Sequence, residues 1–354
     1  MAWQGIEGHD EIVARFAAAH DRDRIAGSYL FVGPPGVGKG TVALGLAKSL
    51  CCERPGPGLV ACGGCASCVQ ADAGSHPDID VVRKPDEKST IPLELLIGDD
   101  EHRMREGLCW RILLKPVVGC RKLAVIMDAD HFSEEAANCL LKTLEEPPQG
   151  AVIILVGAAL ERQLPTIRSR CQVIRFAPLA DDVVRRILDR EARAAGAAPD
   201  DASLDRAARA AGGSLARARL LLDPEVAAFR VRLLDLLASR PLRGVDLARE
   251  TTAFVEAAGK EAPPRRARLR LVLDAALDVL RQAARRAAGV QGDDPAIDTA
   301  TAAWATDPDA AAAAIDRTLD AAEAVDLYAN LGVLIDAWTA VLEEPRLGRL
   351  QPTA

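Results

Sequence analysis

Residues 28–50 read SYLFVGPPGVGKGTVALGLAKSL, and this stretch decides the fold of the first part of the chain. It opens with the apolar run 28–32, continues with the glycine-rich segment 33–39, and ends with a helical pattern at 42–50. A strand, a glycine-rich turn that ends in lysine, and a helix form the loop that cradles the phosphates of a nucleotide. The sequence therefore predicts an α/β domain built around a phosphate-binding loop.

The loop departs from the usual pattern at one position. Its glycines let backbone N–H groups turn inward, and Lys39 supplies a positive charge for the β and γ phosphates. The next residue is normally Ser or Thr, whose hydroxyl ligates Mg²⁺, but here Gly40 takes that place and Thr41 comes one residue late. Nucleotide kinases of the adenylate kinase type also read GKGT, so the loop alone does not exclude catalysis. The candidate nucleotide-binding residues are Gly33, Gly36, Gly38, Lys39, Gly40 and Thr41.

Short apolar runs alternate with helical patterns over the first 178 residues. Continuous apolar strands separated by helices indicate a parallel sheet that is covered on both faces. After Pro178, Ala, Leu and Arg recur at helical spacing, which predicts a helical remainder with a loop or frayed connection at 288–310. The predicted strands are 28–32, 78–82, 122–127, 151–156 and 172–176. The predicted C-terminal helices are 225–238, 245–258, 265–288, 309–328 and 331–343.

The composition is that of a globular protein with more than one domain. The chain has 354 residues, of which 49% are hydrophobic and 27% charged, and we expect three domains. The longest uncharged apolar run, residues 151–160, is half a membrane span, and the N-terminus has no pattern of a secretory signal. The net charge of −7 argues against coating nucleic acid with the whole surface. We expect a cytoplasmic protein without a membrane partner.

Five of the nine cysteines crowd into residues 51–68. Cys62, Cys65 and Cys68 are spaced by two residues, and with Cys51 or Cys52 they can close a tetrahedral Zn²⁺ site. This pattern suits metal binding in a reducing compartment better than disulfides. An iron–sulfur cluster of the ferredoxin kind would favour a further Cys and Pro after the last cysteine, which VQAD lacks. We expect a structural metal, because protein would fill all four positions.

Three further segments make the chain recognisable. These segments are GSHPDIDVV at 74–82, NCLLKTLEEPP at 138–148 and LPTIRSRC at 164–171. Together with the cysteines they resemble the clamp-loader subunits of bacterial DNA polymerase III, which are AAA+ proteins. The resemblance covers residues 1 to about 225 and continues more loosely to the C-terminus. It implies an α/β P-loop AAA+ module at 1–178 with a zinc-binding insertion at 52–68, a small helical lid at 179–224 and an all-α oligomerisation collar at 225–354.

The resemblance also bears on the metal sites. It selects Cys52 over Cys51 as the zinc ligand that joins Cys62, Cys65 and Cys68. Aligned on LLKTLEEPP, the Asp-Glu pair with which ATPase subunits of the family hold magnesium falls on Met127 and Asp128. Methionine is a poor ligand for Mg²⁺. Asp128 or Asp130 as a shifted ligand, and binding of ATP or ADP without turnover, remain open alternatives.

Two other catalytic features of the family are weakened in the same alignment. The polar sensor at a strand end falls on Gly157 or Ala158, and the lid arginine falls on Ala216. Arg217 is one step away, and a helix neighbour rotated by about 100° does not substitute for the missing residue. The resemblance therefore implies that the chain's own ATPase site is degraded.

The SRC motif at 169–171 indicates a different role. In the family this arginine projects into the ATP site of the adjacent subunit as an arginine finger, which makes Arg170 the candidate and Arg168 the weaker neighbour. The implied partners are the ATPase and delta subunits of a clamp loader, with the sliding clamp and primed DNA engaged through the complex. The alternatives are a catalytically active ATPase subunit of the same family and a freestanding nucleotide kinase, in which the SRC motif and the cysteines have no place.

Overall fold

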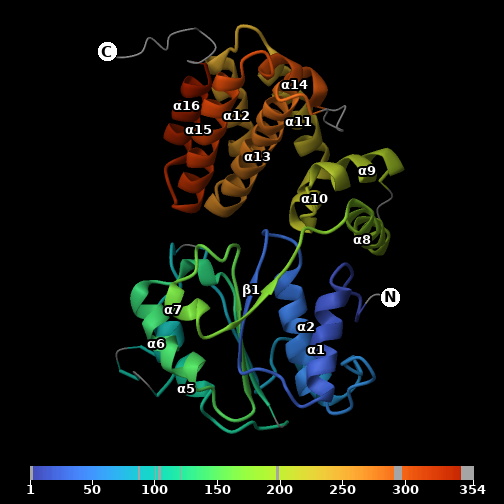
Figure 1. The fold of residues 1–354 in the computed structure, drawn as a ribbon, viewed down its shortest axis with the longest axis vertical. Helices are drawn as coiled ribbons and strands as arrows, with labels where there is room; N and C mark the ends of the chain where they lie inside the picture. Colours follow the sequence, from blue (N-terminus) through green and yellow to red (C-terminus); the bar gives the residue numbers. More distant parts are fainter. Residues whose placement is uncertain are drawn as a thin grey trace. The chain divides into compact units, whose positions relative to one another are not determined.

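The computed structural model describes residues 3–86, 88–99, 101–102, 105–119, 121–196, 199–290 and 297–343. Its first part is built on a parallel sheet of five strands in the order β2-β3-β4-β1-β5 (Figure 1). Every residue of β1, β3 and β4 is buried, which explains why their sequences are apolar apart from Ser28 and Lys122 at the first positions of β1 and β3. The strands are β1 (Ser28–Val32), β2 (Ile79–Val82), β3 (Lys122–Ile126), β4 (Ala151–Val156) and β5 (Gln172–Arg175).

Helices cover both faces of the sheet. Successive residues of a strand point to opposite faces, and both faces carry apolar side chains that the helices bury. Phe31 packs with α1 (Asp10–Asp21) and α2 (Lys39–Cys51) on one face. Leu30 packs with the helices of the other face, which are α4 (Glu94–Ile97), α5 (Leu108–Arg111), α6 (Glu134–Glu145) and α7 (Pro165–Arg168). The two groups lie on opposite sides of β1 in Figure 1. The predicted parallel sheet with helices on both faces is confirmed, and its strands differ from the expected ones by at most one residue at an end.

Three helices follow the sheet and share an apolar cluster of their own. They are α8 (Asp181–Ala194), α9 (Asp201–Ala210) and α10 (Leu215–Leu221). Asp200 and Ser214 begin α9 and α10 by accepting hydrogen bonds from backbone N–H groups in the first turn. The glycine pair 212–213 separates these two helices, so that the first turn of α10 meets the phosphate loop.

The described elements after residue 222 are all helices. Phe229 and Phe254 stack face to face with ring centroids 3.9 Å apart, and the indole N–H of Trp338 donates to the buried Thr318 hydroxyl at 3.0 Å. The helices are α11 (Pro224–Ala238), α12 (Gly244–Glu256), α13 (Ala262–Ala287), α14 (Asp298–Trp304), α15 (Pro308–Asp326) and α16 (Leu331–Glu343).

The expected connection at 288–310 is partly wrong. Residues 291–296 lie outside the described residues, but α14 follows them. Its Trp304 is almost fully buried, and the indole N–H donates to the carbonyl of Leu237 at 3.0 Å. Tertiary burial of one large aromatic side chain thus stabilises a helix of two turns that would be marginal alone.

The chain divides into two compact units, Met1–Leu222 and Asp223–Ala354. Residues 179–222 belong to the first unit, and the expected division into three domains stays a prediction. None of the helices in the described residues is long and apolar enough to cross a membrane.

Candidate functional site

The phosphate loop joins β1 to α2, as its sequence predicts. Gly36 and Gly38 have positive φ angles of 78° and 97°, which other residues rarely adopt. Lys39 is buried, and its Nζ donates to the carbonyl oxygens of Gly33 and Pro34 at 2.5 and 2.7 Å. Burial lowers the pKa of Lys39 to about 8, although the negative charge of Asp130 opposes the shift. The amine that would contact phosphates is therefore hydrogen-bonded to its own loop.

The start of α10 packs directly on this loop. The backbone N–H of Leu215 donates to the carbonyl of Gly36 at 2.9 Å. A Cβ added to Gly36 would lie 2.2 Å from the hydroxyl oxygen of Ser214 and 2.9 Å from Cβ of Ala216. His9, which directly precedes α1, also contacts the loop, and its Nε2 donates to the carbonyl of Val37 at 2.7 Å. Both contacts fasten the loop to neighbouring segments of the chain.

The magnesium position of the loop faces an apolar side chain. A Cβ on Gly40 would lie 3.2 Å from both Sδ and Cε of Met127, so a hydroxyl-bearing residue would press on that methionine. Thr41 is exposed at the next position. Gly40 and Met127 therefore fit each other, and neither supplies oxygen to a metal ion.

The acidic residues after β3 have other surroundings. Asp128 is exposed with a left-handed backbone (φ 57°) at the start of the 3₁₀ turn η1 (Ala129–His131). Asp130 accepts hydrogen bonds on both carboxylate oxygens, from the backbone N–H of Ala158 at 2.5 Å and from Nε2 of Gln163 at 2.6 Å. Asp130 thus fastens the end of β4 to the segment that follows.

The positions that the alignment gives for the sensor (Gly157 or Ala158) and for the lid arginine (Ala216) carry no polar side chain. A Cβ on Gly157 would lie 2.7 Å from Nε2 of Gln163, so the Gln163–Asp130 contact fills the space at this strand end. Ala216 packs near Gly36, and the backbone N–H of Arg217 donates to the Ser214 hydroxyl at 3.3 Å. The sequence motifs did not indicate the role of Gln163.

Arg170 lies just after α7, between the exposed Arg168 and the buried Cys171. Its Nε donates to Oε2 of Glu145 at 3.2 Å, and its Nη1 donates to the carbonyl of Thr166 at 3.0 Å. The side chain of Arg170 is 28% exposed to solvent. The predicted finger residue is therefore partly accessible and held by two oxygen acceptors.

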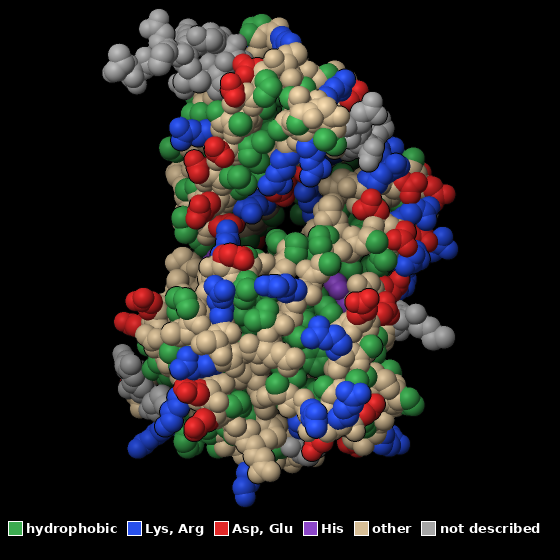
Figure 2. All heavy atoms as spheres, in the orientation of Figure 1, with side chains coloured by type: hydrophobic (Ala, Val, Ile, Leu, Met, Phe, Trp, Pro, Cys, Tyr) green, Lys and Arg blue, Asp and Glu red, His purple; other side chains and the backbone are tan. Residues whose placement is uncertain are grey.

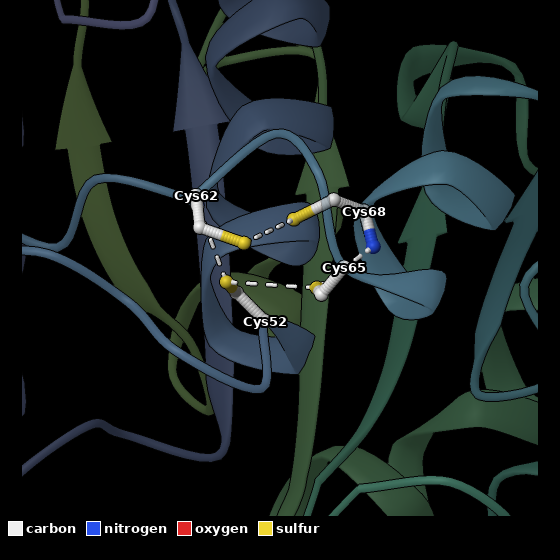
Figure 3. A group of neighbouring side chains, drawn as sticks. All are labelled: Cys52, Cys62, Cys65 and Cys68. Carbon is white, nitrogen blue, oxygen red and sulfur yellow. Dashed lines mark hydrogen bonds between the residues drawn. The ribbon is translucent and has the colours of Figure 1, made fainter.

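The four predicted cysteine ligands lie together (Figure 3). All four sulfurs lie within 4.8 Å of one another, and the distances Cys52–Cys65 and Cys62–Cys68 are both 4.0 Å. Sulfurs that share a tetrahedral ion at Zn–S ~2.3 Å would be ~3.8 Å apart. This donor set therefore fits a metal ion that thiolates bind.

Backbone amides and burial shift the pKa values of two thiols in the cysteine cluster. The N–H groups of Gly64 and Cys65 lower the pKa of the Cys62 thiol to about 6, while burial raises the pKa of Cys68 to about 12. Cys51 is directed elsewhere, since its thiol reaches the carbonyl of Arg121 at 4.0 Å and packs in the core beside the sheet. Because Cys52 lies with the other three sulfurs, its position favours the choice made from the family alignment.

A buried hydrogen-bond chain links the cysteine cluster to the sheet. The hydroxyl of Ser67 donates to the carbonyl of Cys51 at 2.6 Å and accepts from Nε2 of His76 at 2.7 Å. Nδ1 of His76 accepts the N–H of Asp78 at 3.0 Å, and burial lowers the pKa of this histidine. The buried Asp78 carboxylate in turn lies 3.6 Å from Nζ of Lys122. The GSHPD motif thus connects the cysteine cluster to β2 and β3.

Known proteins match parts of this chain. Residues 8–180 match the family described as "DNA polymerase III, delta subunit". The delta-prime subunit of Bacillus subtilis is 34% identical over 172 residues, which cover 48% of this chain and 48% of that protein. The gamma/tau subunit of Mycobacterium tuberculosis is 32% identical over 259 residues, which cover 72% of this chain and 43% of that protein. The chain thus spans about half the length of the curated relatives it matches.

Among solved structures, a DNA polymerase III gamma subunit-related protein from Thermotoga maritima aligns over 96% of this chain and 99% of that protein, with 17% identity and a TM-score of 0.39. The membership therefore rests on the family match and the sequence relatives. Residues 8–180 carry the phosphate loop, the four clustered cysteines and the SRC motif. Residues 8–180 thus belong to the family of DNA polymerase III delta-type clamp-loader subunits, and delta-prime subunits are among the relatives of the chain.

Proposed function

We propose that this chain is the delta-prime (stator) subunit of the DNA polymerase III clamp loader. In this role it supplies Arg170 as an arginine finger to the ATP site of a neighbouring ATPase subunit. A guanidinium that reaches the transferring γ-phosphate stabilises the charge of the transition state and raises the rate by about 10³ to 10⁵. The observation that carries the proposal is a partly exposed arginine, prearranged by two oxygen acceptors, in a chain that matches the delta family.

The chain's own nucleotide site supports a role in which this chain supplies the finger and the neighbouring subunit hydrolyses ATP. Met127 faces Gly40, and both oxygens of Asp130 are engaged by Ala158 and Gln163. Hydrolysis needs oxygen ligands for Mg²⁺ beside the γ-phosphate. We therefore propose that the site does not hydrolyse ATP and that ATP or ADP binds, if at all, without turnover.

The competing candidate is an active ATPase subunit of the gamma/tau type. The 32% identity to the gamma/tau subunit of Mycobacterium tuberculosis over 259 residues favours it. It requires Lys39, Thr41 and Asp128 or Asp130 to hold Mg-ATP. Release of phosphate by the isolated chain, with Mg-ATP and primed DNA present, would support this candidate, whereas the stator predicts no release above background.

We further propose that Cys52, Cys62, Cys65 and Cys68 hold a structural Zn²⁺ ion. Bound zinc would join the end of α2 to the helix α3 (Ala66–Asp72) and would take no part in catalysis, because protein sulfurs fill all four positions. The ion would stabilise a loop-rich insertion whose own apolar cluster is small and consists of Cys52, Ala61, Cys65 and Cys68.

The proposed partners are the ATPase and delta subunits of the clamp loader in the cytoplasm. Sliding clamp and primed DNA would be engaged through the assembled complex. On the face drawn in Figure 2, basic and acidic side chains are interspersed over the first unit, and its described residues form no continuous basic track on that face. This agrees with the net charge of −7 and with DNA contact that depends on the other subunits.

The test uses the reconstituted complex with Arg170→Ala, and with Arg168→Ala as the control. Arg170→Ala should lower DNA-stimulated ATP turnover by a factor of about 10² or more, whereas Arg168→Ala should change it little. Gel filtration should show that both variants assemble. Unchanged turnover in an assembled Arg170→Ala complex would overturn the proposed function.

A further inference from the structure

The guanidinium of Arg170 is held on two sides by its own chain. Nε donates to the carboxylate of Glu145 at 3.2 Å, and Nη1 donates to the carbonyl of Thr166 at 3.0 Å. A second, weaker contact joins Nη1 to the hydroxyl of Ser169 at 3.4 Å. Nη2 has no hydrogen-bond partner among the described residues. The planar group is thus fixed through two nitrogens while the third stays available.

Both holding groups are anchored in one hydrophobic cluster. Leu144 precedes Glu145, Ile167 follows Thr166 and Cys171 follows Arg170, and these three side chains are all buried in the core between the sheet and α6 and α7. The positions of Glu145 and Thr166 therefore depend on the same packed core, although Glu145 itself is 59% exposed.

The end of α6 is fixed a second time at the start of β1. The hydroxyl of Ser28 donates to the carbonyl of Leu144 at 3.1 Å. Pro147 packs so closely on Gly27 that a Cβ there would lie 2.3 Å from its Cγ. The chain on either side of the Glu145–Glu146 pair is thus tied to the start of β1.

We propose that Glu145 is a positioning residue, which orients Arg170 so that its remaining nitrogen meets the γ-phosphate in the adjacent subunit. This inference rests on the proposed function of Arg170. An unrestrained arginine must lose side-chain freedom when it enters the neighbouring site, whereas one held by Glu145 and Thr166 has already lost it. Glu145 thereby makes the charge of the finger available in one orientation.

The adjacent Glu146 provides a matched control. It has the same charge and is exposed, but no hydrogen bond or ion pair joins it to Arg170. In the reconstituted complex, Glu145→Ala should lower kcat for DNA-stimulated ATP hydrolysis by about threefold to tenfold. KM for ATP should stay unchanged, because the neighbouring subunit's pocket binds the nucleotide. Glu145→Gln should retain more activity than Glu145→Ala, since its amide oxygen can still accept the Nε hydrogen bond. Glu146→Ala should behave as the parent chain.

A double-mutant cycle separates this inference from the proposed function. If Arg170 is the finger and Glu145 acts through it, Glu145→Ala should have no further effect in an Arg170→Ala chain. If Arg170→Ala abolished DNA-stimulated ATP turnover while Glu145→Ala left it unchanged, the positioning role of Glu145 would be overturned and the proposed function would stand. Faster turnover with Glu145→Ala would also overturn it, because the carboxylate would then restrain the arginine from its target. Unchanged turnover with Arg170→Ala would instead remove the proposed function itself.

Discussion

The hydroxyl of Ser214 occupies the space that a side chain on Gly36 would need, since a Cβ there would lie 2.2 Å from Ser214 Oγ. Gly36 also has a positive φ of 78°. The phosphate loop and the first turn of α10 are therefore fitted to each other, and the loop tolerates only glycine at this point.

Gly36→Ala should consequently lower the free energy of unfolding by about 2 to 4 kcal/mol, as the sum of overpacking and backbone strain. Gly74→Ala is the control, because Gly74 has a similar φ of 67° with nothing within 4 Å of an added Cβ. Urea unfolding of both variants measures the difference. Equal losses would mean that the contact with Ser214 contributes nothing.

Lys39 predicts a pH dependence of stability. Its pKa is lowered from 10.5 to about 8 in the folded chain, chiefly by burial. Between these values the unfolded chain keeps a proton that the folded chain has released, so the Lys39 contribution makes stability rise with pH across this window. In Lys39→Met that part of the rise should disappear. Urea titrations at pH 7.5 and 9.5 on both chains measure it, and parallel slopes would contradict the prediction.

Metal analysis tests the cysteine cluster. The purified chain should carry about one zinc ion, and Cys65→Ser should lose most of it together with some thermal stability. Cys109→Ser is the matched control, because this buried thiol lies in the sheet core and donates to the carbonyl of Cys139. A brown preparation that contains iron would assign the site to another metal.

Asp78 should matter more for stability than an exposed acid. Its buried carboxylate accepts N–H groups from Val117, Val118 and Gly119 and lies beside Lys122. Asp78→Asn should lower the free energy of unfolding by about 3 kcal/mol at pH 7. Asp72→Asn, which removes a more exposed pair with Lys48, should cost at most about 1 kcal/mol.

The loss should also depend on pH. Burial tends to raise the pKa of Asp78, but the three backbone N–H groups and Lys122 outweigh it, so the pKa lies below the ordinary 3.8. The stabilising contribution is therefore full above pH 3.8 and is lost as the pH falls through the lowered pKa. Unfolding curves of Asp78→Asn and the parent chain should converge in strong acid. Curves that stay equally far apart would refute this role of the carboxylate.

The sequence predicted the strands that are fully buried, because burial gives them runs of apolar residues. β1 and β4 begin and end at the expected residues because all their side chains are buried, and all except Ser28 are apolar or aromatic. The helix α14 was missed, since its stability comes from burial of Trp304 against α11 rather than from a repeated apolar face. Short-range pattern carries no information about such a distant contact.

The same limit applies to the candidate sites. Cysteine spacing identified Cys62, Cys65 and Cys68, whose chain separations are short, but it left Cys51 or Cys52 open, and the choice of Cys52 came from the family resemblance. The contacts Asp130–Gln163 and Arg170–Glu145 join side chains 33 and 25 residues apart, and no local pattern indicates them. Only the packed core that brings α6 and α7 together makes the second contact visible.

The internal hydrogen bonds of Lys39 have a consequence for any nucleotide that reaches the loop. ATP would have to release Nζ of Lys39 from two carbonyl groups before the amine could contact its phosphates. The measured dissociation constant would then equal the intrinsic one divided by the population of open molecules. An open population of about 1% would weaken apparent affinity about a hundredfold. A partner contact that released Lys39 from these carbonyl groups would strengthen nucleotide binding without touching the ligand.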